Sequence, residues 1–311
     1  MSKKVLVTGG AGFIGCHLAE ELADQGYYVT ILDDLSTGKL ENIDGLLRRN
    51  NVDFIRGSVT SLPLLQKLSR DVDYVFHQAA CSSVPGSIED PLTTNEVNIG
   101  GTLRLLLAAR DNKVRKVIYA SSSAVYGDTL TTPQKEDMPP NPLSPYAFTK
   151  LAGEYYCHIF RQMYGLSTVC LRYFNIYGPR QDPHSQYAAV IPAFIERVSR
   201  DLPPIIFGDG NQSRDFAFVD DVVQANILAL QNNAEGTYNI GSGRNTTINE
   251  LAQVVLQAMT KNLPPVYKEP RSSEPRHSSA DITKAKSFGY KPKWALEDGL
   301  QRTIEWFRTV K

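Results

Sequence analysis

The sequence has few cysteines, no excess of either charge and no long apolar run. Its four cysteines, Cys16, Cys81, Cys157 and Cys170, have neither the paired spacing of a disulfide framework nor that of a metal site. Lys and Arg number 33, as do Asp and Glu, so the net charge predicts no nucleic acid and no membrane surface as a partner. Without an apolar span of about 18 residues, and with a strand predicted near the N-terminus, we expect no membrane helix and no signal peptide. Together these absences favour a cytoplasmic protein with reduced thiols and no bound metal.

The apolar residues alternate between strand and helix patterns over the first half of the chain. With 311 residues, 42% of them hydrophobic, the chain is long enough to bury a large core. Strands are predicted over 5–7, 28–32, 52–56, 72–77, 116–121 and 166–171, and helices over 13–22, 61–68, 91–110 and 144–164. This alternation predicts an α/β fold with a doubly wound parallel sheet of the Rossmann type.

The pattern changes after residue 172. Pro and Gly become more frequent, strands shorten, and helices are predicted over 188–200, 220–230, 247–259 and 296–307. We therefore expect a Rossmann domain over 1–172, rejoined by about 215–240, and a smaller, mixed α/β region formed by 173–214 and 241–311. The cleft between two such parts is where a substrate is expected to bind.

Three glycines follow the first predicted strand. Gly9, Gly12 and Gly15 have no Cβ, so the backbone can turn sharply and approach a pyrophosphate at the N-terminus of the next helix. The second strand leads into Asp33 and Asp34, about 20 residues later, where a carboxylate would bind a ribose 2′-hydroxyl and repel a 2′-phosphate. The spacing predicts an NAD site, with a plain tight turn and a solvated strand-end carboxylate as the alternatives.

A phenol, an amine and several hydroxyls follow in positions suited to proton transfer. Tyr146 and Lys150 lie four residues apart on one face of a predicted helix. A neighbouring ammonium would lower the pKa of the phenol and allow it to act as a base. The fifth strand runs into Ser121, Ser122 and Ser123 at the carboxyl edge of the sheet. Taken alone, Tyr146 and Lys150 could be an ordinary amphipathic pair, and the serines could belong to an ordinary turn. Because they occur together with the glycine turn, we favour a catalytic group.

Several segments together resemble one known family. They are residues 8–15, 33–38, 77–80, the serine strand, Tyr146 with Lys150, 172–180 and 214–216. These motifs span nearly the whole chain and are similar to those of extended short-chain dehydrogenase/reductases that act on nucleotide sugars. The resemblance implies a tightly bound NAD and a nucleoside diphosphate sugar as substrate. It implies NAD contacts at Gly9, Gly12, Phe13, Ile14, Gly15, Asp33, Asp34, Ser36, Thr37, Gly38, Ser58, Val59, Gln78, Ala79, Ala80, Asn98, Tyr146, Lys150 and Tyr173.

One position departs from the family pattern. Relatives commonly have Gly-Asp after the third strand, with the aspartate bound to the adenine amino group, whereas this chain has Gly57-Ser58. A serine hydroxyl can accept that hydrogen bond, but more weakly than a carboxylate. We therefore expect NAD to be held less tightly here than in those relatives.

The resemblance also narrows the reaction. Dehydratases and decarboxylases of this kind have an acidic residue after the first active hydroxyl, whereas here Ser122 is followed by Ser123 and Ala124. This leaves oxidation and re-reduction at C4 of the sugar, which is a 4-epimerisation. The implied catalytic residues are Tyr146 as the base, Ser122 and Ser123 as hydroxyls, and Lys150, which would hold the nicotinamide ribose and lower the pKa of Tyr146.

The family pattern also implies contacts to the substrate. Arginine suits a diphosphate because its fork matches phosphate oxygens, although Arg214 could instead form a salt bridge with Asp215 or Asp220. The implied contacts are Asn175, Arg214 and Arg271 for the diphosphate, Glu274 for the uridine ribose, Ala189, Val190, Ile205 and Phe207 around the uracil, and Ser82, Val84, Ser122 and Ser278 near the sugar.

Ser278 bears on the width of the sugar site. By resemblance it lies beside C2 of the sugar, where a serine leaves room for an N-acetyl group, although it could instead lie in a polar surface loop over 270–279. We predict interconversion of UDP-GlcNAc and UDP-GalNAc, with plain UDP-hexoses also accepted. The alternatives are a strict UDP-glucose 4-epimerase, a UDP-uronate 4-epimerase, an oxidoreductase using free NADPH, and a non-catalytic NAD(H)-binding regulator.

Relatives pair through the two long helices predicted over 91–110 and 144–164. We therefore expect a homodimer, unless the apolar faces of these helices belong to the internal core.

Overall fold

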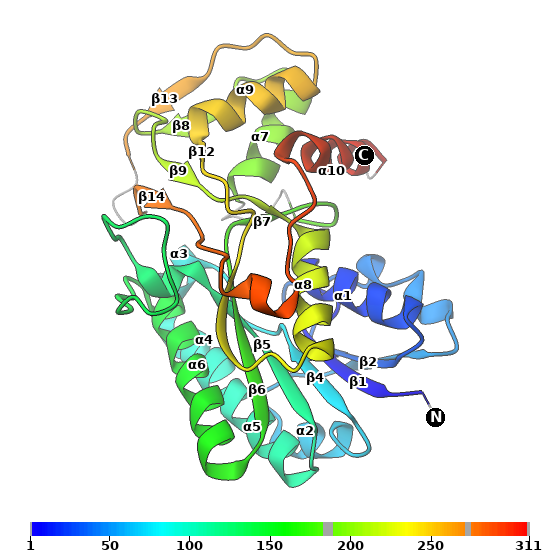
Figure 1. The fold of residues 1–311 in the computed structure, drawn as a ribbon. Coiled ribbons are helices and arrows are strands. Elements are labelled where there is room, and N and C mark those ends of the chain that lie inside the picture. Colours follow the sequence, from blue (N-terminus) through cyan, green and yellow to red (C-terminus); the bar gives the residue numbers. More distant parts are fainter. Residues whose placement is uncertain (1, 183–188, 271–274, 310–311) are drawn as a thin grey trace.

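The structure, a computed structural model, describes residues 2–182, 189–270 and 275–309. Within these residues seven parallel strands form the central sheet in the order β11-β6-β5-β4-β1-β2-β3 (Figure 1). They are β1 (Lys4–Thr8), β2 (Tyr28–Asp33), β3 (Val52–Arg56), β4 (Tyr74–His77), β5 (Lys116–Ser122), β6 (Ser167–Tyr173) and β11 (Gly236–Ile240). The chain winds outward in both directions from β1, so the predicted doubly wound sheet is confirmed.

Alternate residues of the strands face two separate cores. Val5 and Val7 of β1 pack with helices α1 (Phe13–Asp24) and α8 (Val219–Gln231), whereas Leu6 packs on the opposite face. That second face is covered by α2 (Leu62–Leu68), α5 (Thr102–Asp111) and α6 (Pro145–Tyr164). Both faces of a parallel sheet are buried in this arrangement, which explains why its strands are apolar at almost every position.

The helix predicted over 91–110 is not one regular helix. The chain forms α4 (Pro91–Asn95), a π-helical segment η3 (Glu96–Gly101) and then α5. Within the π segment Gly101 packs closely on Val59, where an added Cβ would lie 2.7 Å from the valine Cγ2. A short helix, α3 (Val84–Glu89), precedes α4 and was not predicted. The apolar spacing in the sequence indicates one continuous buried face. A single wider turn changes that spacing too little to be recognised, so the sequence did not indicate the π segment.

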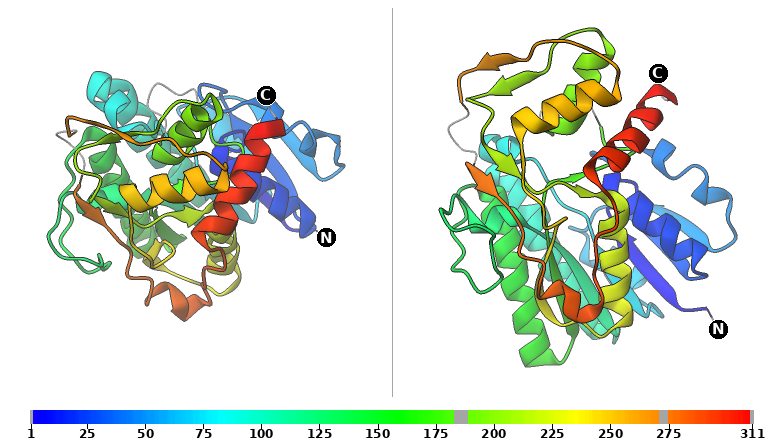
Figure 2. Two further views of the ribbon diagram at one scale, coloured as in Figure 1. Left: turned by 90° about the horizontal axis from the view of Figure 1, so that it is seen from above. Right: turned by 45° about the horizontal axis from the view of Figure 1, so that its top comes forward.

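The smaller region lies beyond the carboxyl ends of the central strands (Figures 1 and 2). Its helices are α7 (Val190–Ser199), α9 (Ile248–Ala258) and α10 (Leu296–Thr309), which share one apolar core. Its short strands pair as β7 (Ile176–Tyr177) with β10 (Ala217–Phe218), β8 (Ile205–Phe207) with β13 (Val266–Lys268), and β9 (Ser213–Arg214) with both β12 (Thr246–Thr247) and β14 (His277–Ser278). Between them α8 and β11 return to the central sheet, where β11 pairs with β6. Short 3-10 turns complete the chain at η1 (Leu40–Asn42), η2 (Leu46–Arg48), η4 (Ser123–Tyr126) and η5 (Ala285–Phe288).

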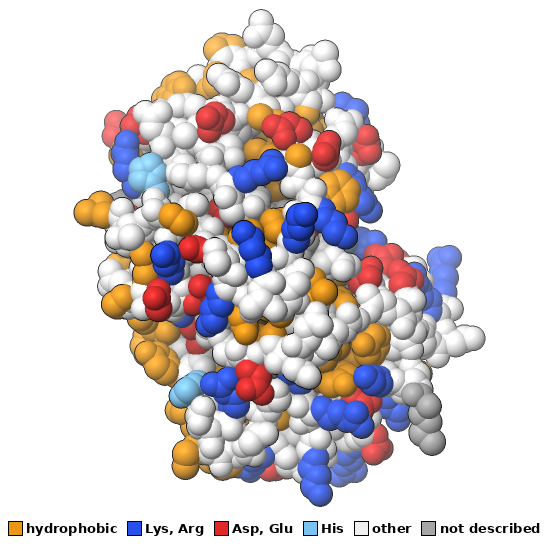
Figure 3. Space-filling model, viewed as in Figure 1, with side chains coloured by type: hydrophobic (Ala, Val, Ile, Leu, Met, Phe, Trp, Pro, Cys, Tyr) orange, Lys and Arg blue, Asp and Glu red, His pale blue; other side chains and the backbone are white. Residues whose placement is uncertain are grey.

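The surface carries both signs of charge. On the face in Figure 3, Lys and Arg side chains are interspersed with Asp and Glu rather than gathered in one field. In the described part of the chain no helix combines the length and apolarity needed to cross a membrane. All four cysteines are free thiols.

Candidate active site

The turn from β1 into α1 forms a close-fitting glycine cradle. Gly9 has a φ of +68°, and an added Cβ would lie 2.6 Å from the backbone nitrogen of Ala79, the second residue after β4. Gly15 packs on the turn itself, where an added Cβ would overlap the carbonyl oxygen of Gly9. Gly12 is the N-cap of α1, so Phe13 and Ile14 open the helix and its first amides face this turn. The cradle fits a pyrophosphate, because backbone donors and the helix dipole meet where no side chain intrudes.

Asp33 supports this cradle directly. It is 7% exposed at the end of β2, and its carboxylate accepts hydrogen bonds from the amides of Ala11, at 3.0 Å, and Leu35, at 2.8 Å. Burial raises the pKa of Asp33 and the backbone donors lower it. Two bonded amides leave acceptor sites on the carboxylate, so the predicted bond to a ribose hydroxyl is compatible with this arrangement. Asp34 and the neighbouring Ser36 and Thr37 are exposed, and Gly38 packs on the Asp33 carboxylate.

A hydrogen-bond chain behind the cradle fixes one histidine as neutral. Thr102 donates to the carbonyl of Asn98 at 2.5 Å, so its hydroxyl accepts from His77 Nε2 at 2.9 Å. The other ring nitrogen therefore accepts from Thr8, at 2.7 Å. Burial lowers the pKa of His77 to about 3. His77 thus ties β1 to β4 and the π segment, a role that the sequence resemblance did not specify.

Asn98 lies behind the cradle and is 2% exposed. Its amide accepts from the backbone nitrogen of Cys81 at 2.8 Å, and donates to the Cys81 carbonyl and to the Thr149 hydroxyl. These bonds hold the segment that follows β4 in place, and the contact to NAD that the family resemblance implied for Asn98 stays a prediction.

Two predicted cofactor residues meet a third residue that was missed. The side chains of Gln78 and Tyr173 are hydrogen-bonded at 3.1 Å, and both bond to Asn226 on α8. Burial raises the pKa of Tyr173 to about 12. A single asparagine among the apolar residues 225–230 of α8 is the signal that could have identified Asn226, because a buried amide requires partners.

Ser58 is bonded within its own turn. Its hydroxyl accepts from the amide of Thr60 at 3.3 Å and from the Thr60 hydroxyl at 3.1 Å. The bond between the two hydroxyls can also run from Ser58 to Thr60, which leaves the Ser58 oxygen an acceptor site, so the contact with the adenine amino group stays a prediction. The adjacent Val59 is buried against the π segment.

The predicted catalytic hydroxyls lie together at the carboxyl end of β5. Tyr146 is the second residue of α6, and Ser122 lies near its phenol, where it lowers the pKa of Tyr146. The amide of Tyr146 donates to Ser87 Oγ at 3.1 Å, so α3 helps to position the start of α6. Ser122 also accepts from the amide of Ala124 at 3.1 Å, and Ser123 begins the η4 turn.

Lys150 lies behind Tyr146 and is 4% exposed. Its ammonium donates to the carbonyl of Ala120 at 2.8 Å and lies 5.9 Å from the centre of the Tyr146 ring. Burial lowers the pKa of Lys150 to about 8. Burial is also the main influence on Tyr146 and raises its pKa, while Ser122 lowers it. In the protein alone, desolvation therefore outweighs the effect of Ser122 on the Tyr146 pKa, and the lowering by Lys150 stays a prediction.

A cavity of about 500 Å³ lies in the smaller region. Phe207 and Arg214, both predicted to contact the nucleotide, line it. Arg276 lines the same cavity and forms an ion pair with Asp209 at 2.9 Å, which the sequence did not suggest. The remaining lining residues are Gly208, Asp209, Gln212, Lys268, Glu269, Pro270 and Pro275. An arginine-bearing cavity beside an aromatic side chain fits a nucleoside diphosphate.

The acidic residues suggested as alternative partners of Arg214 are held elsewhere. The Asp215 carboxylate accepts from the amides of Ser242, Gly243 and Ala280, and Asp220 pairs with Arg302 at 3.2 Å. The backbone carbonyl of Asp215 accepts from the side-chain amide of Asn175 at 3.2 Å.

Ser278 lies in a strand rather than in a surface loop. It is buried in β14 and lies opposite Arg214 in the parallel pairing with β9. Gln134 fixes the residue that follows, because it exchanges two 2.7 Å bonds with the Ser279 backbone. Gln134 is 1% exposed and comes from the long segment after η4, which sequence patterns left without a role.

The other predicted substrate residues lie around the same end of the molecule. Val84 begins α3, Val190 begins α7, Ala189 is the N-cap of α7 and Ile205 begins β8; Ser82 and Ala80 lie between β4 and α3. Arg271 and Glu274 lie outside the described residues. Among the described residues no three His, Cys, Asp or Glu side chains gather in a group that could hold a metal ion.

Solved structures of nucleotide-sugar enzymes superpose on the whole chain. A UDP-N-acetylglucosamine 4-epimerase from Methanobrevibacter ruminantium M1, in complex with UDP-N-acetylmuramic acid, is 42% identical, with a TM-score of 0.97 over 100% of this chain and 99% of that one. A UDP-glucose 4-epimerase from Thermotoga maritima with UDP-glucose is 41% identical, with a TM-score of 0.94 over 99% of each chain. The UDP-glucose 4-epimerase of Thermus thermophilus in complex with NAD is 39% identical, with a TM-score of 0.91 over 99% of this chain and 100% of that one.

The amino-acid sequence also matches a family of such enzymes. Residues 5–241 match a single family, and they include the glycine cradle, Ser122, Tyr146, Lys150 and Arg214. The chain belongs to the NAD dependent epimerase/dehydratase family.

Proposed function

We propose that this protein is an NAD-dependent UDP-sugar 4-epimerase that interconverts UDP-GlcNAc and UDP-GalNAc and also accepts UDP-glucose. The observation that carries the proposal is the grouping of Ser122, Tyr146 and Lys150 at the sheet edge beside the glycine cradle: Ser122 lies near enough to the phenol to lower its pKa, and Lys150 is buried behind the ring. The position after Ser123 is Ala124, which cannot move a proton and so argues against dehydration. The named structural relatives are all UDP-sugar 4-epimerases.

Each catalytic residue would have a distinct role in the proposed epimerisation. NAD, when bound, supplies the hydride acceptor for C4 and a positive ring that favours a phenolate. Tyr146 would take the proton of the C4 hydroxyl, and the neighbouring Ser122 would share that proton. Lys150 would hold the nicotinamide ribose and faces the phenol with its positive charge. Tyr146 would return the proton to the C4 oxygen in the second half of the reaction.

Inversion at C4 requires the sugar to turn while the nucleotide stays in place. Phe207 and Arg214 in the 500 Å³ cavity would hold the nucleotide part, on a lobe separate from Tyr146. Anchoring the diphosphate rather than the sugar ring leaves the ring free to present either face.

The proposed acceptance of N-acetylated sugars depends on Ser278. The strand pairing that places it opposite Arg214 brings a small side chain next to a predicted diphosphate contact. A serine there would leave space for an N-acetyl group. A strict UDP-glucose 4-epimerase is the second candidate, because two of the named relatives carry that name.

The first experiment tests whether the purified protein epimerises UDP-sugars without added cofactor. Purified protein incubated separately with UDP-GlcNAc, UDP-glucose and UDP-glucuronate is expected to form the C4 epimers of the first two, as measured by sugar analysis. Tyr146→Phe should lower kcat by at least about 100-fold, because the base is lost, while the affinity for UDP stays near wild type. Epimerisation that requires added NADPH would contradict the proposal, and no turnover of any sugar would favour an NAD(H)-binding regulator.

The second experiment tests the width of the site. Ser278→Tyr should reduce kcat/KM for UDP-GlcNAc at least about tenfold more than for UDP-glucose, because the phenol would occupy the N-acetyl space. Ser278→Ala is the matched control and should leave the ratio of the two substrates unchanged. Equal losses on both substrates in the tyrosine variant would remove Ser278 from substrate selection.

A homodimer is part of the proposal. Phe148, Tyr155, Ile159 and Met163 form an exposed apolar stripe along α6, and Leu92 of the adjacent α4 is 82% exposed. These side chains do not belong to the internal core, and a contiguous apolar face is typical of a subunit interface. A cytoplasmic location stays a prediction from the free cysteines.

A further inference from the structure

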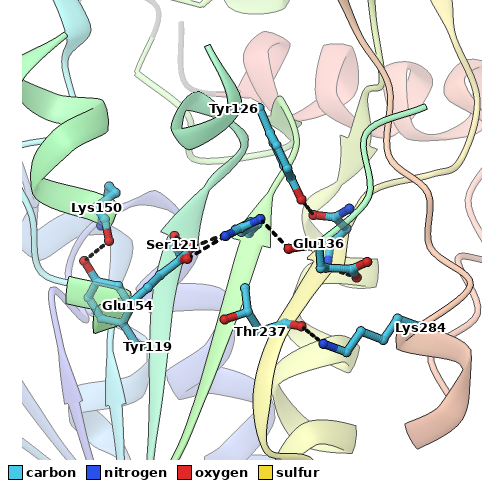
Figure 4. A network of polar contacts seen from close by, with 10 residues as sticks. Tyr119, Ser121, Tyr126, Glu136, Lys150, Glu154, Thr237 and Lys284 are labelled. Carbon is cyan, nitrogen blue, oxygen red and sulfur yellow. Dashed lines mark hydrogen bonds and ion pairs between the residues drawn. The ribbon is translucent and has the colours of Figure 1, made fainter. Parts of the chain in front are cut away.

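Helix α6, which carries Tyr146 and Lys150, is attached to β5 by three hydrogen bonds. One runs from the Lys150 ammonium to the carbonyl of Ala120, and the other two lie one helical turn apart. Tyr119 donates to the carbonyl of Lys150 at 3.5 Å, and Ser121 donates to the carboxylate of Glu154 at 2.5 Å (Figure 4). Tyr119 and Ser121 are two residues apart on one face of the strand, about 6.7 Å, which is close to the 5.4 Å rise of one helical turn. The strand and the helix are therefore in register along this contact.

Glu154 is also held by the next strand. Arg172 of β6 donates to both of its carboxylate oxygens, at 2.8 and 2.7 Å, and the two side chains are 7% and 6% exposed. Ser121 and Arg172 lie opposite each other in the pairing of β5 with β6. One buried carboxylate thus joins three elements and receives three hydrogen bonds.

The other side of Arg172 is also fixed. Its guanidinium lies 4.7 Å from the centre of the Tyr126 ring, and the Tyr126 hydroxyl donates to Asn239 of β11 at 2.7 Å. The backbone of Asn239 in turn donates to Glu136 at 2.8 Å. Arg172 is therefore held by the sheet and its neighbouring loop, so the position of Glu154 follows the sheet rather than the helix.

Such a network constrains geometry more than it adds stability. A buried charge pair costs desolvation, and it is favourable only in the one arrangement that satisfies every group. Glu154 follows Lys150 by one helical turn and Tyr146 by about two. A shift or rotation of α6 that keeps its apolar packing would break these polar bonds and would also move the phenol away from Ser122.

We propose that Ser121 and Glu154 are positioning residues for catalysis, which set the register of α6 so that Tyr146 meets Ser122 and Lys150. Ser121 acts through Glu154 and does not touch the substrate, although it is the neighbour of Ser122 in sequence. The proposal rests on the proposed function for its reaction but concerns only residues behind the catalytic face.

Ser121→Ala tests the proposal with the smallest change. Loss of one hydroxyl should lower kcat by about 10- to 100-fold through misplacement of Tyr146, with KM for UDP-glucose within about twofold of wild type. The acidic limb of the pH profile of kcat should move to higher pH, because the phenol moves away from Ser122, which lowers its pKa. Ser121→Thr, which keeps the hydroxyl, should restore kcat and the pH profile.

Ser69→Ala is the matched control. Ser69 is buried like Ser121, but its hydroxyl has no hydrogen-bond partner among the described residues, and it lies at the far end of α2. It should leave kcat and its pH profile unchanged. Glu154→Gln is a second variant that keeps the side-chain shape, and it should lower kcat at least as much as Ser121→Ala. If Glu154→Gln does not fold, Ser121→Ala decides the question alone.

The outcomes separate the two proposals. Wild-type protein without turnover would contradict the proposed function. A Ser121→Ala variant with the wild-type kcat and pH profile, even one with a lower melting temperature, would overturn the positioning role while leaving the epimerase proposal intact.

Discussion

At the scale of single residues, the least ordinary group in the site is a buried lysine held by a neutral partner. Lys150 donates to a backbone carbonyl and faces the rings of Tyr119 and Tyr146 at 5.3 and 5.9 Å. Neither contact offsets desolvation fully, so the pKa of Lys150 falls from 10.5 to about 8. The amine is therefore charged at neutral pH and loses its proton only slightly above it.

This pKa predicts the alkaline limit of activity. Below about pH 8 Lys150 is protonated and can favour the phenolate of Tyr146, whereas above it the amine is neutral. We expect kcat/KM for UDP-glucose to fall as pH rises through about 8 in initial-rate measurements from about pH 6 to about pH 10. Lys150→Arg keeps the charge at every pH and should lose this alkaline limb, whatever its maximal rate. An unchanged limb in that variant would assign it to another group.

Local sequence features predicted some residue positions and not others. The spacing of Tyr146 and Lys150 on a helix, and of serines at a strand end, depends on neighbours in sequence, and the structure brings Ser122 and Tyr146 together as expected. The bonds of Ser58 and Asp33 depend on Thr60 and on the turn at Ala11, so the sequence could not say which acceptors remain for a ligand. The side-chain contacts to NAD stay predictions.

At the scale of elements, α6 lies on β5 because of a glycine. An added Cβ on Gly153 would lie 2.9 Å from Cε1 of Tyr119 and would overlap the hydroxyl of that ring. This close approach lets Tyr119 reach the carbonyl of Lys150. The helical periodicity of 145–164 predicted the helix, whereas the distance between helix and sheet depends on which glycine faces the strand.

Gly153→Ala should therefore destabilise the protein, although alanine is the better helix former. We expect the free energy of unfolding to fall by about 1–3 kcal/mol, because the ring or the helix must move to admit the methyl group. Gly45→Ala is the matched control: its added Cβ meets nothing within 4 Å and its φ is −65°, so it should be neutral or stabilising by up to about 1 kcal/mol. Urea unfolding of both variants measures the difference, and equal effects would show that the contact with Tyr119 is not the cause.

At the scale of the whole molecule, the central sheet and the helices of the lobe above it could be predicted, since those expected over 188–200, 247–259 and 296–307 are α7, α9 and α10, whereas the short strands of the lobe could not. Strands of four to seven residues that alternate with helices determine a parallel order, and that order is the one observed. The lobe pairs β9 with β12 and β14, each of two residues, and such short strands have no detectable period. Arg276 comes from the irregular stretch before β14 and Gln134 from the long segment after η4; both help to shape the substrate side and were missed because such segments show no period.

The assembly of two such molecules is the last prediction. The α6 stripe of Phe148, Tyr155, Ile159 and Met163 is too contiguous to be a set of isolated surface residues, and a charge within it would be desolvated in a dimer. We expect sedimentation velocity to report twice the chain mass for the wild type and a shift to monomer for Ile159→Glu. Leu202→Glu is the control, because Leu202 has the same 44% exposure as Ile159 but follows α7 in the smaller region. A dimer that Ile159→Glu leaves intact, or that Leu202→Glu also disrupts, would place the interface on another surface.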